Sequence, residues 1–246
     1  MKVLPLALAF ICLILAAMPC QAVVTFVQVK GNSSSSAASL ATTFTSATTT
    51  GNFVVVAVAV FEGTAINSVT DNKSNTYTAD FNVVLATRRI AVFSSPNITG
   101  GASHSVTVAL ASVSEITVAI HEYSGVATTA SLDQTKTNDN ASSTTWTSTA
   151  TATTTQADEL LFGIAYDPFS STTTYAAGAS YTARITQTNP SGDTLFTEDR
   201  VVAATGAYVA DGTSSPAAPT KAGIVTYKAA GGAAAQAPLR RRQLLE

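Results

Sequence analysis

Cysteine is scarce in this 246-residue chain, and both cysteines fall in one short region. Cys12 and Cys20 lie in an apolar N-terminal stretch that follows the positively charged Lys2. Small residues at Cys20 and Ala22 suit the minus-three and minus-one positions of a signal-peptidase site, so residues 1–22 are predicted to be a cleaved signal peptide. The mature chain would then lack thiols. That excludes disulfides, cysteine-ligated zinc, a thiolate nucleophile and iron–sulfur chemistry.

Charge and histidine are also sparse. Charged residues make up 11% of the chain and the formal net charge is −2, whereas a soluble domain usually has about 25% charged residues. A nucleic-acid partner is not predicted, because such proteins need a basic stripe to meet the phosphates. The two histidines, His104 and His121, are too few for a clustered zinc site. Gly125 stands where a metalloprotease motif starting at His121 would need its second histidine. We therefore predict no metal and no cofactor.

Long apolar runs are missing after the N-terminal stretch, and that stretch is shorter than the roughly 20 residues of a membrane span. We expect no transmembrane segment in the mature chain. A lipid anchor at Cys20 is disfavoured because Pro19 stands where a lipobox has Gly or Ala. The predicted location is secreted or at the cell surface, with the periplasm as an open alternative.

Strand-forming residues dominate the rest of the chain, and roughly one residue in six is threonine. The run from Phe53 to Phe61 contains only apolar residues, which predicts a central strand covered on both faces. Val106–Leu110, Ile116–Ile120 and Leu160–Tyr166 instead carry their larger apolar residues at alternate positions, a period-two pattern typical of antiparallel strands. Turn residues such as those at 71–75 separate these segments.

These patterns predict an all-β fold: an antiparallel β-sandwich, jelly-roll-like, forming a single domain over residues 23–229. Asp211-Gly212 is expected to precede a loop that carries Pro216 and Pro219. Residues 230–246 are predicted to be a flexible Gly/Ala-rich tail that ends in a solvated cluster of arginines at 240–242.

Four short segments resemble, in order, motifs of exported bacterial β-sandwich modules of uncharacterised function. These modules occur alone or beside immunoglobulin-like and lectin-like domains. The segments are NSVTD with NTYT (67–78), PNITGG (96–101), EYSGV (122–126) and DELLFG (158–163). The resemblance implies a secreted β-sandwich, and it supplies no catalytic residues.

Three glutamates are candidates for catalysis, because a glycosidase needs two carboxyl groups about 5–10 Å apart. They are Glu122, Glu159 and Glu198. Strict alternation places Glu122 on the apolar face of its strand, where a carboxylate must be hydrogen-bonded, paired or raised in pKa. The alternative is a structural role for Glu122, through a twist of the strand or an ion pair with Arg184 or Arg200. No G-x-S-x-G elbow occurs in the chain.

Aromatic residues with nearby polar groups are candidates for sugar binding, because a sugar ring has an apolar face and a hydroxyl rim. The predicted binding residues are Trp146, Tyr175, Tyr181 and Asp167. Trp146 is the only tryptophan, and its alternative role is to fill an edge of the sandwich. Asp71 with its neighbouring asparagines could offer oxygen ligands to Ca²⁺, but one carboxylate favours a turn.

Two hypotheses for function remain. The first is a non-catalytic secreted or surface β-sandwich with an adhesive, structural or glycan-contact role, whose partner is a glycan or another extracellular surface component. The second is a jelly-roll carbohydrate-active enzyme, a glycoside hydrolase or lyase that uses Glu122 with Glu159 or Glu198. The first is preferred because no complete catalytic constellation is found in the sequence.

Overall fold

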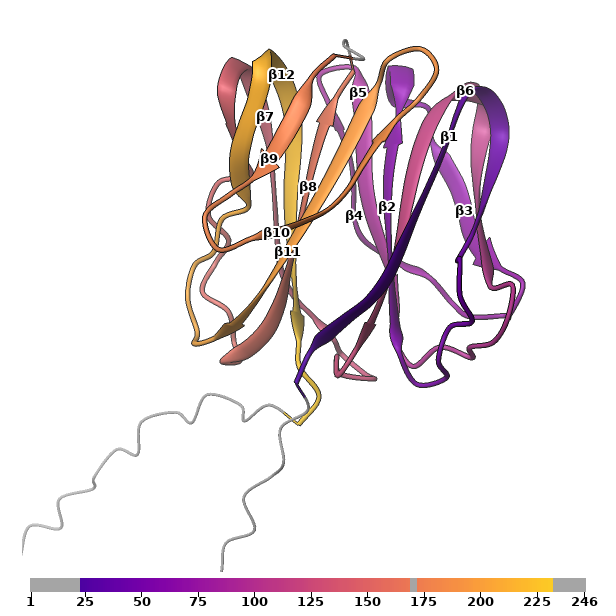
Figure 1. Ribbon diagram of the computed structural model, residues 1–246, viewed down its shortest axis with the longest axis vertical. Coiled ribbons are helices and arrows are strands. Elements are labelled where there is room, and N and C mark those ends of the chain that lie inside the picture. Colours follow the sequence, from indigo (N-terminus) through magenta and orange to yellow (C-terminus); the bar gives the residue numbers. More distant parts are fainter. Residues whose placement is uncertain (1–22, 169–171, 232–246) are drawn as a thin grey trace, which may run out of the picture.

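The computed structural model describes residues 23–168 and 172–231 (Figure 1). The predicted signal peptide (1–22) and nearly all of the predicted tail (230–246) lie outside the described residues. Twelve strands occur in the described part: β1 Thr25–Thr43, β2 Phe53–Val60, β3 Ile66–Asp71, β4 Thr78–Leu85, β5 Arg88–Ser95, β6 Ser105–Ser124, β7 Leu132–Thr147, β8 Asp158–Asp167, β9 Thr174–Ala177, β10 Thr182–Thr188, β11 Thr194–Ala203 and β12 Asp211–Lys228. The helical content of this part is a single 3-10 turn, Phe61–Gly63. None of its helices is long and apolar enough to cross a membrane.

The strands form two antiparallel six-stranded sheets that pack as a sandwich, which confirms the predicted fold class. Strands β1–β6 make the first sheet, and strands β7–β12 make the second. The first runs from indigo to magenta in Figure 1 and the second from rose to yellow. Each half of the chain therefore builds one sheet.

Both sheets have the same connectivity. The order is β1-β6-β2-β5-β4 in the first sheet and, read from its other edge, β7-β12-β8-β11-β10 in the second. The last strand of each half is long and changes partner along its length. β6 pairs with β3 and then β2, while β12 pairs with β9 and then β8. The second half thus repeats the topology of the first.

A central core fills the space between the sheets. Phe53, Val55, Ala57 and Ala59 of β2 face inward, and β8 contributes Leu160, Phe162, Ile164 and Tyr166 from the opposite side. All eight residues of β2 are buried. This confirms that Phe53–Phe61 contains a central strand covered on both faces.

Each sheet also has an apolar cluster on its outer face. The first outer cluster joins Val54, Val56, Val58 and Val60 of β2 to residues of β5 and β6, with β1 and β3 packed against it. The second outer cluster comprises Trp146, Leu161, Ala165, Phe196, Val202, Ala210, Ala222 and Ile224, with four partly buried residues against it. The long strands contribute residues to these outer clusters: β1 and β6 in the first sheet, β7 and β12 in the second. Each half of the chain therefore has a packed apolar layer on the outer face of its own sheet.

Two buried tyrosines connect the sheets through carboxylates. In the Tyr123 clamp, the Tyr123 hydroxyl of the first sheet donates to Asp199 Oδ2 of the second sheet at 2.6 Å. Arg184 Nε donates to the same oxygen at 2.7 Å. In the Tyr227 clamp, Tyr227 of the second sheet donates to Asp80 Oδ2 of the first, and Ser94 donates to Asp80 Oδ1 at 2.9 Å.

The two clamps occupy equivalent places in the repeated topology. Asp80 lies at the register break of β4 against β5, and Arg184 lies at the register break of β10 against β11. A β-bulge re-aims the side chain at the break. Here the bulge carries the carboxylate in one clamp and the cation in the other.

Candidate functional site

The structure brings three of the four predicted binding residues together at the second outer cluster. Tyr175 and Tyr181 pack against this cluster, which contains Trp146. The rings of Trp146 and Tyr175 have centroids 6.4 Å apart, and Tyr175 stacks on Phe196 at 5.5 Å. Trp146 itself is 2% exposed, so its ring faces are largely covered by protein.

Asp167 is not a member of the second outer cluster, but it lies close to Tyr175: burial and the charge of Asp167 raise the pKa of that tyrosine. It ends β8, is 1% exposed and accepts a hydrogen bond from Thr173 Oγ1 at 2.7 Å. This contact ties the end of β8 to the start of β9.

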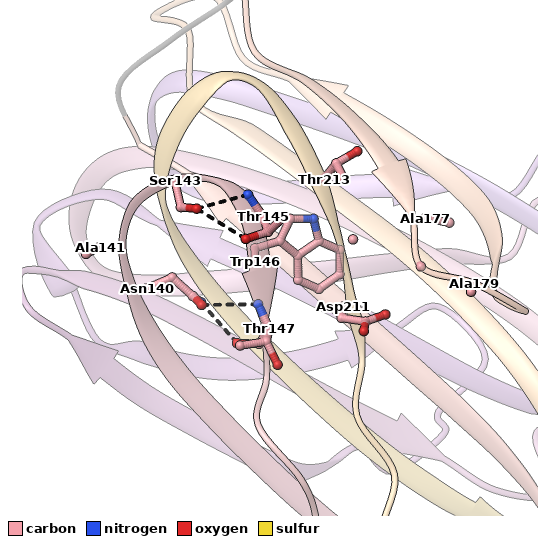
Figure 2. A pocket seen from close by; sticks show the side chains of 12 residues that line it. Asn140, Ala141, Ser143, Thr145, Trp146, Thr147, Ala177, Ala179, Asp211 and Thr213 are labelled. Carbon is pink, nitrogen blue, oxygen red and sulfur yellow. Dashed lines mark hydrogen bonds between the residues drawn. The ribbon is translucent and has the colours of Figure 1, made fainter.

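A pocket of about 630 Å³ lies next to Trp146, between β7, the end of β9 and the start of β12 (Figure 2). Its lining residues are Asn140, Ala141, Ser143, Thr145, Trp146, Thr147, Ala177, Gly178, Ala179, Asp211, Gly212 and Thr213. Most are small or carry a hydroxyl or amide group. Ligand sites are typically concave and combine an apolar surface with a few polar groups.

Gly212 lets the indole lie across β12. Trp146 and Gly212 are directly opposite each other in the β7–β12 register. A Cβ added at Gly212 would meet the indole carbons Cε2 and Cζ2 of Trp146 at 2.9 Å and the Ala176 carbonyl oxygen at 2.3 Å. A larger residue at position 212 would therefore displace the tryptophan from the pocket wall.

Several polar groups of the pocket are already engaged with one another. Asn140 Oδ1 accepts from the Thr147 N–H, and Asn140 Nδ2 donates to the carbonyls of Thr147 and Thr220. Ser143 Oγ accepts from the Thr145 N–H at 3.1 Å. These bonds hold the β7 side of the pocket in shape.

Three polar groups beside the pocket have no side-chain hydrogen-bond partner in the described part of the chain; Asp211 and Thr213 are exposed, whereas the indole N–H is buried. The Trp146 Nε1–H is buried and has no acceptor among the described residues. The Asp211 carboxylate and the Thr213 hydroxyl have no side-chain hydrogen bond within that same part of the chain. Figure 2 shows the indole between Thr213 on one side and Asp211 on the other. An acceptor, a donor and a hydroxyl thus lie around one cavity.

Glu198 contacts the rim of this pocket through the backbone of Gly178. It is fully buried, and its Oε2 accepts a hydrogen bond from the Gly178 N–H at 3.1 Å. A Cβ at Gly163 would lie 2.9 Å from Glu198 Cγ, so Gly163 makes room for this side chain. Burial, which disfavours the charged form, raises the pKa of Glu198 to about 8.

Glu159 is buried at the start of β8, on the same outer face of the second sheet. Burial, with the neighbouring Asp133 carboxyl, raises the pKa of Glu159 to about 8. Asp133 in turn accepts hydrogen bonds from Thr155 and lies 3.7 Å from Lys228 Nζ.

Glu122 lies on the outer face of the first sheet, in line with Ile116, Val118 and Ile120, as strict alternation predicts. Its Oε1 accepts from Asn52 Nδ2 at 2.7 Å and from the Thr49 N–H at 2.8 Å. Gln28 Nε2 donates to Oε2 at 2.7 Å. Neutral amides therefore satisfy this buried carboxylate.

The three glutamates are not brought together. Glu122 faces outward from the first sheet, whereas Glu159 and Glu198 face outward from the second, so both sheets lie between Glu122 and the other two. In the β8–β11 register Glu159 is opposite Val202, four residues along β11 from Glu198. At the usual strand rise this corresponds to about 13 Å between the Cα positions. Glu159 and Glu198 therefore extend from well-separated positions of the second sheet.

The histidines belong to internal hydrogen-bond networks. His121 Nε2 lies 2.9 Å from Thr197 Oγ1 between the sheets, and burial lowers the pKa of His121 to about 3. His104 bridges Asp71 Oδ2 at 2.7 Å and Thr48 Oγ1 at 2.8 Å. Thr48 and His104 are both buried, which favours a structural role for this chain of bonds.

Asp71 forms a turn, as the sequence predicts. Its Oδ1 accepts from the Lys73 and Asn75 N–H groups, and its Oδ2 accepts from Asn75 Nδ2 and the Tyr77 hydroxyl. Both carboxylate oxygens are thus occupied by donors. Within residues 23–168 and 172–231, no group of three or more His, Asp or Glu side chains could hold a metal ion.

Sequence reasoning missed Asp211 and Thr213 because their segment was expected to lead into a loop. That expectation was wrong: β12 begins at Asp211 and continues through Pro216 and Pro219. The register breaks between Thr213 and Ala218 and again between Pro219 and Lys221, which accommodates prolines that cannot donate to the ladder. The Asp211-Gly212 pair, with Pro216 and Pro219 after it, is a pattern that predicts a loop, so the sequence contains no indication of a strand here.

Comparisons with protein-family models, curated proteins and solved structures found no match to the chain.

Proposed function

We propose that this protein is a non-catalytic secreted or surface β-sandwich that contacts a glycan or another extracellular surface component through the pocket beside Trp146. The observation that carries the proposal is the set of three unpartnered polar groups around one cavity. These are the Trp146 Nε1–H, the Asp211 carboxylate and the Thr213 hydroxyl.

The chemistry of these groups suits a saccharide. A carboxylate accepts hydrogen bonds from hydroxyl groups, an indole N–H donates to a hydroxyl oxygen, and a threonine hydroxyl does either. Small side chains such as Ala141, Ala177 and Ala179 leave the cavity open to a ring. A concave surface with a few placed polar groups is typical of small-ligand sites.

The enzymatic alternative receives less support. Glu198 is the candidate acid nearest the pocket, and neither Glu122 nor Glu159 lies opposite it across a cavity. The predicted signal peptide and the resemblance to exported bacterial modules support an extracellular setting. Secretion or a location at the cell surface is therefore part of the proposal.

Tryptophan fluorescence tests the proposal directly, because Trp146 is the only tryptophan in the chain. The purified protein is titrated with a panel of neutral, cationic and acidic oligosaccharides. We expect a saturable change in emission with at least one of them, and its loss in Asp211→Asn. Glu62→Gln is the matched control, because Glu62 is an exposed acid on the first sheet's side of the molecule and does not line the pocket.

Two outcomes would contradict the proposal. One is an emission spectrum that no saccharide alters, with no heat of binding by calorimetry. The other is saturable binding that Asp211→Asn and Thr213→Val leave intact.

A further inference from the structure

We propose, on the basis of the function proposed above, that the pocket recognises a positively charged amino sugar, with Asp211 pairing with its ammonium group. A deacetylated hexosamine, in which an ammonium stands next to a hydroxyl, is the ligand class.

The charges of the pocket point to a cationic ligand. Asp211 is the one charged residue among those that line the cavity, and no Lys, Arg or His contributes to this lining. Arg200 lies close enough to influence Tyr181, but it does not line the pocket. An acidic sugar would place its carboxylate near Asp211 without a cation to compensate it.

Asp211 is held in position before a ligand arrives. A Cβ added at Gly178 would lie 2.0 Å from Asp211 Oδ1 and 2.5 Å from the Asp211 carbonyl oxygen. The carboxylate therefore packs directly on the Gly178 backbone, which Glu198 fixes through the Gly178 N–H. Side chains held by packing and a second layer of hydrogen bonds bind with less ordering cost.

The Trp146 Nε1–H and the Thr213 hydroxyl determine which other groups of the ligand can be bound. Trp146 Nε1–H is a donor only, so it cannot bind an ammonium, but it can bind the oxygen of a hydroxyl. Thr213 is exposed, lies on the other side of the indole from Asp211 in Figure 2, and can bind a sugar hydroxyl that is farther from the ammonium. An acceptor for the cation on one side of the indole, with groups that bind hydroxyls on the other side, matches a sugar that carries both an ammonium and hydroxyl groups.

The test compares three oligosaccharides of equal length at about pH 6, where a sugar amine is mostly protonated. They are a glucosamine tetramer, an N-acetylglucosamine tetramer and a galacturonic acid tetramer. Binding is measured by Trp146 fluorescence and by calorimetry. We expect the glucosamine tetramer to bind at least about tenfold more tightly than the acetylated one. We expect no binding of the acidic tetramer.

Substitutions and salt assign this preference to Asp211. Asp211→Asn should reduce glucosamine affinity to that of the acetylated tetramer, whereas Glu62→Gln, which removes the same charge elsewhere, should leave it unchanged. Raising the salt from about 0.05 M to about 0.5 M should weaken the glucosamine complex more than any neutral complex.

Any of the following outcomes would overturn the inference. Equal affinity for both hexosamine tetramers, or tighter binding of the acidic one, would do so and would leave the proposed saccharide function standing. Equal loss of affinity in Asp211→Asn and Glu62→Gln would reduce the preference to general charge attraction. Absence of binding by every saccharide would remove the proposed function as well.

Discussion

The two halves of the molecule share one strand order, yet they use their outer faces differently. Within the described residues, the first outer cluster has fourteen buried members and the second has eight. The second cluster instead adjoins the pocket beside Trp146 and accommodates Glu198. The same strand order can therefore carry either a closely packed apolar layer or a pocket, depending on the side chains of its outer face.

The residues responsible differ in size and branching. β2 places valines at alternate outer positions, and β-branched side chains pack well on a pleated surface. The second half has Gly163 and Gly212 on its outer face, where they make room for Glu198 and Trp146. Glycine at these positions leaves space on the outer face of the sheet, and larger side chains and the pocket occupy that space.

The clamps show the same contrast at the centre of the sandwich. Asp199 of the Tyr123 clamp is paired with Arg184, whereas Asp80 of the Tyr227 clamp receives neutral donors alone. Burial raises the pKa of Asp80 to about 6. A cation at one bulge and a carboxylate at the other therefore give equivalent positions different responses to pH.

The largest expected difference between the halves lies in their pH response. Glu159 and Glu198 of the second half have pKa values raised to about 8 from 4.5. The folded state therefore binds more protons than the unfolded chain between these values, and the free energy of unfolding falls as pH rises from about 5 to 9. The shift of each glutamate corresponds to a loss on the order of 5 kcal/mol, and urea unfolding at several pH values measures the sum of the two.

Variants assign this loss to the second half. The double variant Glu159→Gln and Glu198→Gln should flatten the dependence above about pH 6.5. Asp80→Asn should remove only the portion between its ordinary pKa of 3.8 and about 6. A free energy of unfolding that is constant or rises from about pH 5 to 9 would contradict the burial described for these groups.

Packing density gives the next largest effect. Ile120 and Ile224 are both fully buried, one in each outer cluster. We expect Ile120→Ala to cost about 4 kcal/mol and Ile224→Ala about 2 kcal/mol, because the smaller cluster has more room to relax. Urea unfolding at one pH measures both values. Equal costs, or a larger cost for Ile224→Ala, would show that the second cluster is packed as densely as the first.

The clamps should differ by a smaller amount. Tyr227→Phe leaves Asp80 with Ser94 as its donor, whereas Tyr123→Phe leaves Asp199 paired with Arg184. At pH 7 we expect costs of about 2 kcal/mol and about 1 kcal/mol, respectively. Below about pH 5 the cost of Tyr227→Phe should shrink, because a protonated Asp80 no longer leaves a charge unpaired. Thermal unfolding at the two pH values tests this, and the reverse order of costs would contradict it.

The smallest effect on stability is expected at the pocket itself. Asp211 is exposed, so Asp211→Asn should change the free energy of unfolding by less than about 0.5 kcal/mol while it impairs binding. Urea unfolding of the variant measures this value. A larger loss would mean that Asp211 has a structural role, and its effect on binding would then need to be separated from folding.

Alternation of side chains was sufficient to predict much of the fold. A continuous apolar run showed that Phe53–Phe61 contains a strand covered on both faces, and alternation placed Glu122 among apolar neighbours. Alternation says nothing of which strands pair, so the division of the chain into two sheets of equal topology was not predicted. Long strands that change partner, such as β6 and β12, have no local signature.

The candidate site was predicted in part. Aromatic content led to Trp146, Tyr175 and Tyr181, which the structure gathers in one cluster. Asp211 and Thr213 escaped because a strand that passes through Pro216 and Pro219 by register breaks resembles a loop in sequence. Long-range pairing places these residues beside Trp146, and no local pattern encodes that pairing.

The most direct test of the difference between the halves is the NMR spectrum of the protein during titration with saccharides. The chain has one tryptophan, so one indole N–H resonance reports on the pocket. We predict that this resonance and the amide resonances of Gly178 and Gly212 shift together with a saturating ligand, while those of the first sheet stay in place. Shifts confined to the first sheet, or none with any saccharide, would contradict a binding site in the second half.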